Sequence, residues 1–189
     1  MKVVSSLIEK AKSPMYDEDS VLVERYLAGD HTVFEVLYNK YYDKVAAIAR
    51  GIVLDNDEAA DAVQEIFTLV YRHLARFDKR SKFSTWLFRV AVNRSIQQAR
   101  RLKYKTRQVP LNEALGQSTP EEVNDAEVRV QEALAKLSPQ DRALLTLFYW
   151  EEHSLQEIAE ALHCGLNAAK TRLYRARERF RGVYEGGVT

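Results

Sequence analysis

The 189-residue sequence contains a single cysteine, Cys164, which excludes an internal disulfide and a multi-cysteine zinc site. Seven glycines and four prolines are few for this length and leave little material for hairpin turns, whereas helix-favouring residues dominate. No uncharged apolar run is long enough to span a bilayer, and the N-terminal segment lacks the apolar core of a secretory signal. We therefore expect a cytoplasmic, all-α protein without direct membrane insertion.

Acidic residues are absent from positions 79–107, although the whole chain has a formal net charge of only +1. The segment is rich in lysine and arginine, and these alternate with Phe83, Trp86, Phe88 and Tyr104. Cations that follow a phosphate backbone, beside aromatic faces on which bases can stack, are typical of proteins that bind single-stranded or opened nucleic acid. The alternative is an ordinary helix with a solvated basic face over an aromatic core stripe.

Apolar residues at helical spacing predict helices on either side of Gly29, and Asp30 is the expected N-cap of the second one. A further helix after position 57 carries Asp61, Gln64 and Glu65 on its polar face. Phe67 falls outside the buried stripe of this helix, so we expect a partly exposed aromatic side chain among carboxylates. Such a side chain suits a surface for a protein partner, and a satellite core contact is the alternative.

The composition changes abruptly after the basic segment, because residues 108–128 contain acidic residues but no lysine or arginine. Proline, glycine and serine mark a linker over 108–118. We expect a poorly ordered N-terminus (1–19), a first domain (20–107) and a second domain (119–189) that opens with a capping box at Thr119-Pro120-Glu121-Glu122. A helix restarts in the same manner at Ser138-Pro139-Gln140-Asp141, with Ser138 as its cap. The predicted fold is therefore two small helical domains joined by a flexible linker.

The C-terminal domain has the pattern of a helix-turn-helix. A capping box begins at Ser154, a turn follows at His163-Cys164-Gly165, and the next helix is strongly basic outside the stripe formed by Leu166, Ala169, Leu173, Ala176 and Phe180. Four residues near its N-terminus would face base edges in a major groove: Asn167, Ala168, Lys170 and Thr171. Three arginines would reach phosphates: Arg172, Arg175 and Arg179. A helical hairpin with an arginine-rich exposed face is the alternative. At the turn, the left-handed conformation falls either on His163, which tolerates it better than a β-branched residue does, or on Gly165.

Three stretches in this order, 61–78, 82–101 and 137–180, resemble bacterial RNA polymerase sigma factors. The chain is most similar to the compact extracytoplasmic-function class, which keeps only regions two and four of the larger sigma factors. The resemblance implies a promoter-specificity subunit that is not an enzyme and has no cofactor. Its implied partners are core RNA polymerase (the β′ clamp helices and the β flap), promoter DNA and an anti-sigma factor.

The resemblance also implies roles for individual residues. The helix that docks on polymerase would present Asp61, Gln64, Glu65, Phe67 and Val70. Recognition and melting of the minus-ten element would use Lys79, Arg80, Ser81, Lys82, Phe83, Trp86, Asn93, Arg94, Arg100 and Arg101. The minus-thirty-five element would contact Asn167, Ala168, Lys170, Thr171, Arg172, Arg175 and Arg179. Because residues 163–169 depart from the turn that is common in the family, the DNA sequence recognised at the minus-thirty-five element does not follow from it.

Two other functions are less well supported by the sequence. A free-standing operator-binding regulator would need a self-complementary dimer surface, and none is evident in the sequence. An enzyme is disfavoured because the sequence has no phosphate-cradling glycine loop and no HExxH motif, and the Glu160-x-x-His163 pair has no second copy. Asp61 and Glu65, four residues apart, could share a cation but are more often solvated or paired with a partner's arginines. We therefore expect no metal site and no small-molecule substrate.

Overall fold

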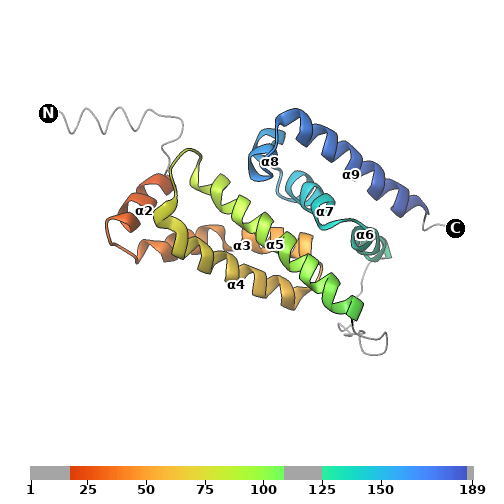
Figure 1. Cartoon of the computed structure of the whole chain (residues 1–189), viewed down its shortest axis with the longest axis horizontal. Helices are drawn as coiled ribbons and strands as arrows, with labels where there is room; N and C mark the ends of the chain where they lie inside the picture. The colour runs from red at the N-terminus through yellow and green to blue at the C-terminus, as the bar shows by residue number, and fades with distance from the viewer. Residues whose placement is uncertain (1–17, 109–124, 187–189) are drawn as a thin grey trace.

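The computed structural model describes residues 18–108 and 125–186, and within these ranges the chain is built from helices without strands (Figure 1). The first region comprises α2 (Glu18–Leu27), α3 (Val33–Val53), α4 (Asn56–His73), the 3-10 turn η1 (Leu74–Arg76) and α5 (Phe83–Gln108). The second comprises α6 (Asp125–Lys136), α7 (Pro139–Leu145), the π-helical turn η2 (Thr146–Trp150), α8 (Leu155–Ala161) and α9 (Leu166–Gly186). The all-α prediction is confirmed for these residues. The predicted linker, apart from Gln108, and the capping box at 119–122 lie outside them.

The first region is a bundle in which α3, α4 and α5 pack against one another (Figure 1). The periodic apolar positions of α3, α4 and η1 form its core, as the sequence predicted: Leu37, Tyr41, Val45, Ile48, Ile52, Ala59, Val63, Ile66 and Leu74 are all buried. The start of α4 is fixed by Asp55, whose side chain accepts a hydrogen bond from the backbone N–H of Glu58.

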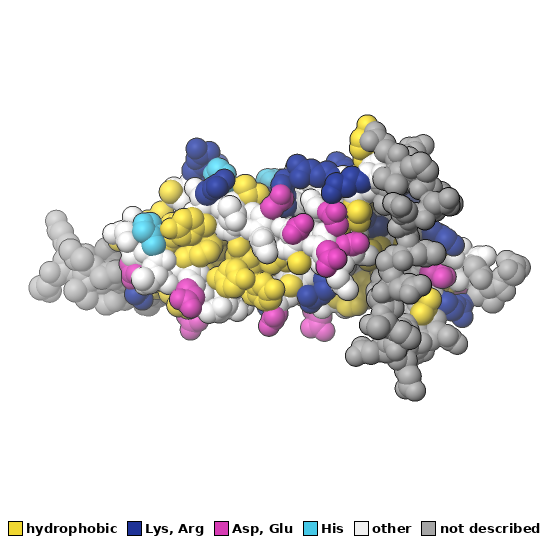
Figure 2. All heavy atoms as spheres, turned by 90° about the horizontal axis from the view of Figure 1, so that it is seen from below, with side chains coloured by type: hydrophobic (Ala, Val, Ile, Leu, Met, Phe, Trp, Pro, Cys, Tyr) yellow, Lys and Arg dark blue, Asp and Glu magenta, His cyan; other side chains and the backbone are white. Residues whose placement is uncertain are grey.

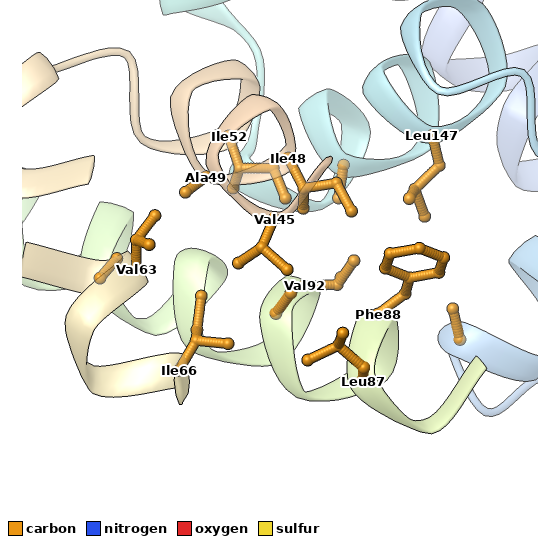
Figure 3. Close-up of a cluster of buried hydrophobic side chains, with 14 of the residues drawn as sticks. Val45, Ile48, Ala49, Ile52, Val63, Ile66, Leu87, Phe88, Val92 and Leu147 are labelled. Carbon is orange, nitrogen blue, oxygen red and sulfur yellow. The ribbon is translucent and has the colours of Figure 1, made fainter. Parts of the chain in front are cut away.

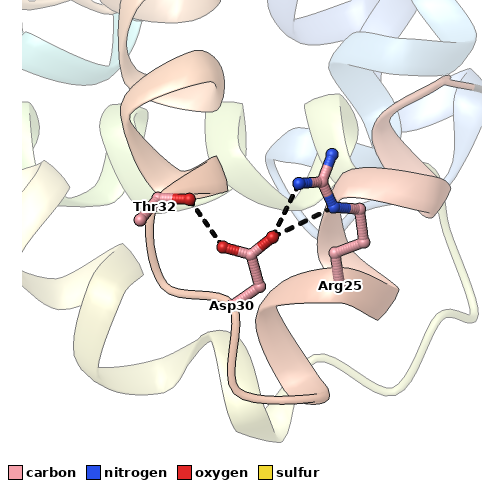
Figure 4. A network of polar contacts seen from close by, with 3 residues as sticks. All are labelled: Arg25, Asp30 and Thr32. Atoms are coloured by element: carbon pink, nitrogen blue, oxygen red, sulfur yellow. Dashed lines mark hydrogen bonds and ion pairs between the residues drawn. The ribbon is translucent and has the colours of Figure 1, made fainter.

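The predicted N-cap at Asp30 is wrong, because α3 begins at Val33 and Thr32 occupies the cap position without a side-chain cap bond. The Asp30 carboxylate instead accepts hydrogen bonds from the Thr32 hydroxyl and the Arg25 guanidinium, 2.6 Å away in each case (Figure 4). These two contacts, that of Thr32 first, lower the pKa of the Asp30 carboxyl. The carboxylate therefore joins the end of α2 to the start of α3 rather than capping a helix.

The expected disorder of residues 1–19 is also wrong at its last two positions, since α2 begins at Glu18. Asp19 is buried, accepts a hydrogen bond from the Tyr41 hydroxyl, and pairs with the Lys40 ammonium at 2.7 Å. A buried carboxylate needs such partners to offset its desolvation. Asp19 thus fastens α2 to α3.

The second region confirms both of its described caps. Ser138 accepts a hydrogen bond from the backbone N–H of Asp141 at the start of α7, and Ser154 with Glu157 forms the predicted capping box of α8. Of the two candidates for the left-handed residue of the turn, His163 has the positive φ of 50° and Gly165 does not. Leu166, predicted to be buried, is exposed.

The two regions pack against each other through a continuous apolar core. Ile48 of α3, Phe88 of α5 and Leu147 of η2 meet there, as the close-up shows (Figure 3). Gly51 of α3 lies so close to η2 that a Cβ added to it would be 2.5 Å from the Thr146 Oγ1. The way in which the two regions pack against each other was not predicted from the sequence. Across 18–108 and 125–186, no helix is both long and apolar enough to cross a membrane.

Candidate nucleic-acid interface

The polar face of α4 is open to solvent at Asp61 and Gln64, whereas Glu65 forms an ion pair with Arg94 of α5. Both helices line a cleft of about 870 Å³ that also contains Arg101. The structure therefore brings residues predicted for a protein partner beside residues predicted for DNA.

Phe67 does not have the partial exposure that the sequence predicted. Its side chain is 5% exposed and packs under Tyr38 and Tyr42 of α3, with ring centroids 4.5 and 6.4 Å away. Helix α3 supplies aromatic side chains one turn apart, and these cover the ring. Val70 is buried as well. The exposed aromatic groups here are therefore the two tyrosines, and Phe67 and Val70 support the surface from below.

Hydrophobic side chains gather on this side of the molecule. In the view from below, they form a broad patch bordered by acidic side chains, with basic side chains along its upper edge (Figure 2). Among the exposed large hydrophobic residues of the first region are Val36, Tyr38, Tyr42 and Tyr71. An apolar area with a charged rim is typical of a protein-interaction surface.

In the loop before α5 and in the first turn of α5, some of the residues predicted to contact DNA are exposed, whereas others are paired or buried. Arg80 and Lys82 are exposed, Ser81 is half-buried, and Lys79, which has a φ of 57°, pairs with Glu24 of α2 at 2.9 Å. Phe83 is 2% exposed and belongs to the core. The half-buried Trp86 packs near it with its ring tilted by 42° and the ring centroids 6.0 Å apart. An aromatic platform for a base would thus rest on Trp86 rather than Phe83.

The basic charge of α5 is partly neutralised by α4. Besides the Arg94–Glu65 pair, Glu58 accepts hydrogen bonds from the Gln98 amide and the Lys105 ammonium. Asn93, Arg100 and Arg101 remain exposed. Gln98 and Lys105 were not predicted as partners of Glu58, although the acidic charge of α4 and the basic charge of α5 indicated that such pairs form.

Helix α9 exposes the residues predicted for base and phosphate contacts: Asn167, Ala168, Lys170, Thr171, Arg172, Arg175 and Arg179. The Thr171 hydroxyl donates to the Asn167 carbonyl oxygen at 3.0 Å, an internal helix bond. The Arg179 guanidinium donates to Asp141 of α7 at 2.7 Å, and the Asp141 side chain is only 10% exposed. Arg179 therefore ties α9 to α7, in addition to any phosphate contact.

The packing of the two regions turns the two predicted DNA surfaces toward one cavity of about 590 Å³. Asn93 and Arg100 of α5 line one side, and Arg172, Arg175 and Arg179 of α9 line the other. The sequence placed these residues in separate domains and missed that they converge.

The described residues offer no metal centre: among them, no group of three or more His, Cys, Asp or Glu side chains is arranged to hold a metal ion. What the geometry offers is cationic and amide groups on α5 and α9, with an acidic and aromatic surface on α3 and α4. Such groups can bind a phosphate backbone and a protein partner.

Family models match both regions of the chain. Residues 37–104 match the model of sigma-70 region 2, and residues 127–180 match the model of sigma-70 region 4.

Curated relatives match nearly the whole length. The RNA polymerase sigma-H factor of Pseudomonas aeruginosa is 30% identical over 86% of this chain and 91% of its own length. The ECF RNA polymerase sigma-E factor of Escherichia coli is 34% identical over 85% of this chain and 91% of its own length. The ECF RNA polymerase sigma factor SigW of Bacillus subtilis is 31% identical over 84% of this chain and 92% of its own length.

Solved structures share the fold. CnrH, in complex with the cytosolic domain of CnrY, superposes with a TM-score of 0.68 at 22% identity, over 90% of this chain and 99% of that chain. The sigma factor RpoE of Bartonella quintana, in complex with the anti-sigma factor NepR, gives a TM-score of 0.62 at 21% identity, over 80% of this chain and 96% of that chain.

Proposed function

This chain belongs to the sigma-70 family of RNA polymerase sigma factors, in the extracytoplasmic-function class, and from that premise we propose how its surfaces divide the work of promoter-specific initiation. The observation that carries the proposal is that both sigma regions match in order, on the two parts of the chain that bear the basic surfaces. The protein acts in the cytoplasm, binds core polymerase and promoter DNA, and has no catalytic activity of its own.

The polymerase contact is assigned to α4, with the β′ clamp helices as the partner. Asp61 and Gln64 are exposed on this helix, and the aromatic side chains of Tyr38 and Tyr42 lie next to it over Phe67. Carboxylates beside exposed aromatics suit a basic, partly apolar helix pair. The second region would contact the β flap.

Promoter contact is assigned to α5 and α9. The loop 79–82, Trp86 and Asn93 would hold the opened minus-ten element, where a flipped base costs a few kcal/mol of stacking and pairing. Asn167, Lys170 and Arg175 would contact the minus-thirty-five element in the major groove. Arg172 and Arg179 would reach phosphates.

An anti-sigma protein is the proposed regulator. Support comes from two solved structures with this fold, because each holds a protein partner: CnrH is bound to the cytosolic domain of CnrY, and the sigma factor RpoE is bound to the anti-sigma factor NepR. The partner of this chain would cover the acidic and aromatic surface of α3 and α4, and would thereby compete with polymerase.

The test is reconstitution with bacterial core RNA polymerase, followed by transcription from a pool of genomic promoters. We expect stable co-elution and initiation at one defined motif. Asp61→Lys should weaken core binding about tenfold or more, because it reverses a charge at the proposed contact. Asp57→Lys makes the same charge change on the exposed first turn of α4 and serves as the matched control.

Arg175→Ala should reduce promoter affinity by about 1–3 kcal/mol if the guanidinium contacts a base, with the loss concentrated at one promoter position. Arg181→Ala, on the same helix and paired with Glu178, is its control. Binding of duplex DNA without any affinity for core polymerase would contradict the assignment and favour a free-standing regulator.

A further inference from the structure

The cavity between α5 and α9 has the composition of an anion site. Four arginines line it, Arg100, Arg172, Arg175 and Arg179, against a single acidic residue, Asp141. That carboxylate is already bonded to Arg179. Within the described part of the chain, Arg100, Arg172 and Arg175 have no ion-pair partner. Positive charge in the cavity is therefore left without a counter-charge from the residues that the structure describes.

In the closed arrangement, the two regions pack together with this cavity between them. The convergence of arginines on the cavity raises the free energy of that arrangement. Guanidinium groups from two different regions face one cavity, and like charges repel more strongly beside a protein surface than in bulk water. The apolar core between the regions opposes this repulsion. An anion held between α5 and α9 would remove the repulsion and add charge-assisted hydrogen bonds to both sides.

The volume and the other lining groups narrow the class of anion. About 590 Å³ lies within the range of roughly 300–1,000 Å³ that is typical of small-molecule sites. One guanidinium group can donate hydrogen bonds to two phosphate oxygens at once. Several arginines together therefore favour a ligand that carries a chain of phosphates. Asn93 and Gln97 supply amides that can both donate and accept, and Ile96 and Leu144 supply apolar wall. These groups fit a base attached to the phosphates.

We propose that the cavity between α5 and α9 binds a nucleoside polyphosphate, which holds the two regions in the closed arrangement. The same guanidinium groups are assigned to promoter DNA above, so the ligand and the promoter would exclude each other. The proposal goes beyond the proposed function, because this binding needs neither polymerase nor DNA. Its failure would leave the reconstitution result unchanged.

The test is isothermal titration calorimetry of the full chain with magnesium-free ATP and, separately, with inorganic tripolyphosphate. We expect one ATP per chain and a weaker interaction with tripolyphosphate, which lacks the base. Arg100→Ala and Arg172→Ala should each weaken ATP binding about tenfold or more, since each removes a charge-assisted contact from a different region.

The controls are Arg181→Ala on α9 and Arg76→Ala on η1, exposed arginines that do not line the cavity. They should change ATP affinity by less than about twofold. Equal weakening by all four substitutions would show binding to the general basic surface and would overturn the site, as would the absence of ATP binding. Equal affinity for the two probes would overturn the nucleoside part of the proposal.

Discussion

At the scale of single residues, several charged side chains of the proposed surfaces are held by partners within the chain. Glu65 pairs with Arg94, Lys79 with Glu24, and Arg179 with Asp141. Removing one member leaves the other unpaired, which costs most at the nearly buried Asp141. Arg179→Ala therefore changes the packing of α9 on α7 as well as any DNA contact, whereas Arg175 has no such partner among the described residues.

Phe67 belongs to the core, so its removal should act on stability. Phe67→Ala is expected to lower the free energy of unfolding by about 3–5 kcal/mol, through the lost transfer energy and the cavity beneath Tyr38 and Tyr42. Chemical denaturation would measure this loss. Gln64→Ala, one turn away and exposed, should change stability by no more than about 0.5 kcal/mol. Similar values for the two variants would refute the burial of Phe67.

At the scale of helices, apolar periodicity and capping boxes predicted where most elements lie. The caps at Ser138 and Ser154 depend on nearby residues alone, which is why the sequence could place them. Asp30 was misjudged because its carboxylate bonds to the side chains of Arg25 and Thr32 rather than to a helix N-terminus. Phe67 was misjudged because Tyr38 and Tyr42 of another helix cover it. The face of a helix that is covered is decided by tertiary contacts, which periodicity does not contain.

His153 sits between η2 and α8, and its ring packs on Phe88 of α5 with centroids 4.8 Å apart. Its Nε2 is buried without a hydrogen-bond partner in the described chain. Burial lowers the pKa of His153, with Glu157 opposing this shift and Lys44 adding to it. The neutral ring is thus the form that the packed helices accommodate.

Protonation of His153 should therefore weaken the packing of η2 and α8 against α5. A histidine whose pKa is lowered in the folded state contributes its full stabilisation at pH values above 6.5, the ordinary histidine pKa. This contribution is lost as the pH falls below 6.5. We expect the free energy of unfolding to fall as the pH is lowered from about 7.5 through the ordinary histidine pKa, as urea titrations at several pH values would measure.

His153→Leu should remove most of this fall, whereas His163→Asn, in the exposed turn, should keep it. A pH dependence that His153→Leu leaves unchanged would contradict the assignment. The Glu157 carboxyl, whose pKa is lowered chiefly by its hydrogen bond with Ser154, loses its contribution only below 4.5 and stays outside this window.

At the scale of the whole molecule, the two regions share a core that the sequence did not predict. Each region has its own periodic pattern, and nothing in either pattern states which outer residues will meet. Gly51 was the one indication of this packing in the sequence. A glycine inside a helix costs about 1 kcal/mol relative to alanine, so its presence indicates that another element approaches the helix closely there. The candidate DNA residues were all named from the sequence, but their common cavity depends on this packing.

Gly51→Ala should separate the regions. The added Cβ would lie 2.5 Å from the Thr146 Oγ1, and overpacking of this kind costs about 1–3 kcal/mol. Small-angle scattering should show a larger radius of gyration, with the helical content unchanged. Thr146→Ala in the same chain removes the clashing atoms and should restore part of the compactness. Scattering identical to that of the unaltered chain would rule out Gly51 as the point of closest approach.

The two tryptophans of the chain are divided between the two regions. Trp86 is half-buried among Phe77 and Phe83 in the first, whereas Trp150, at the end of η2 in the second, is 55% exposed. An indole in an apolar environment emits at shorter wavelength than one in water and is less accessible to soluble quenchers. The molecule therefore carries one optical reporter in each half, so emission spectra can follow the first region and the second separately in the unlabelled protein.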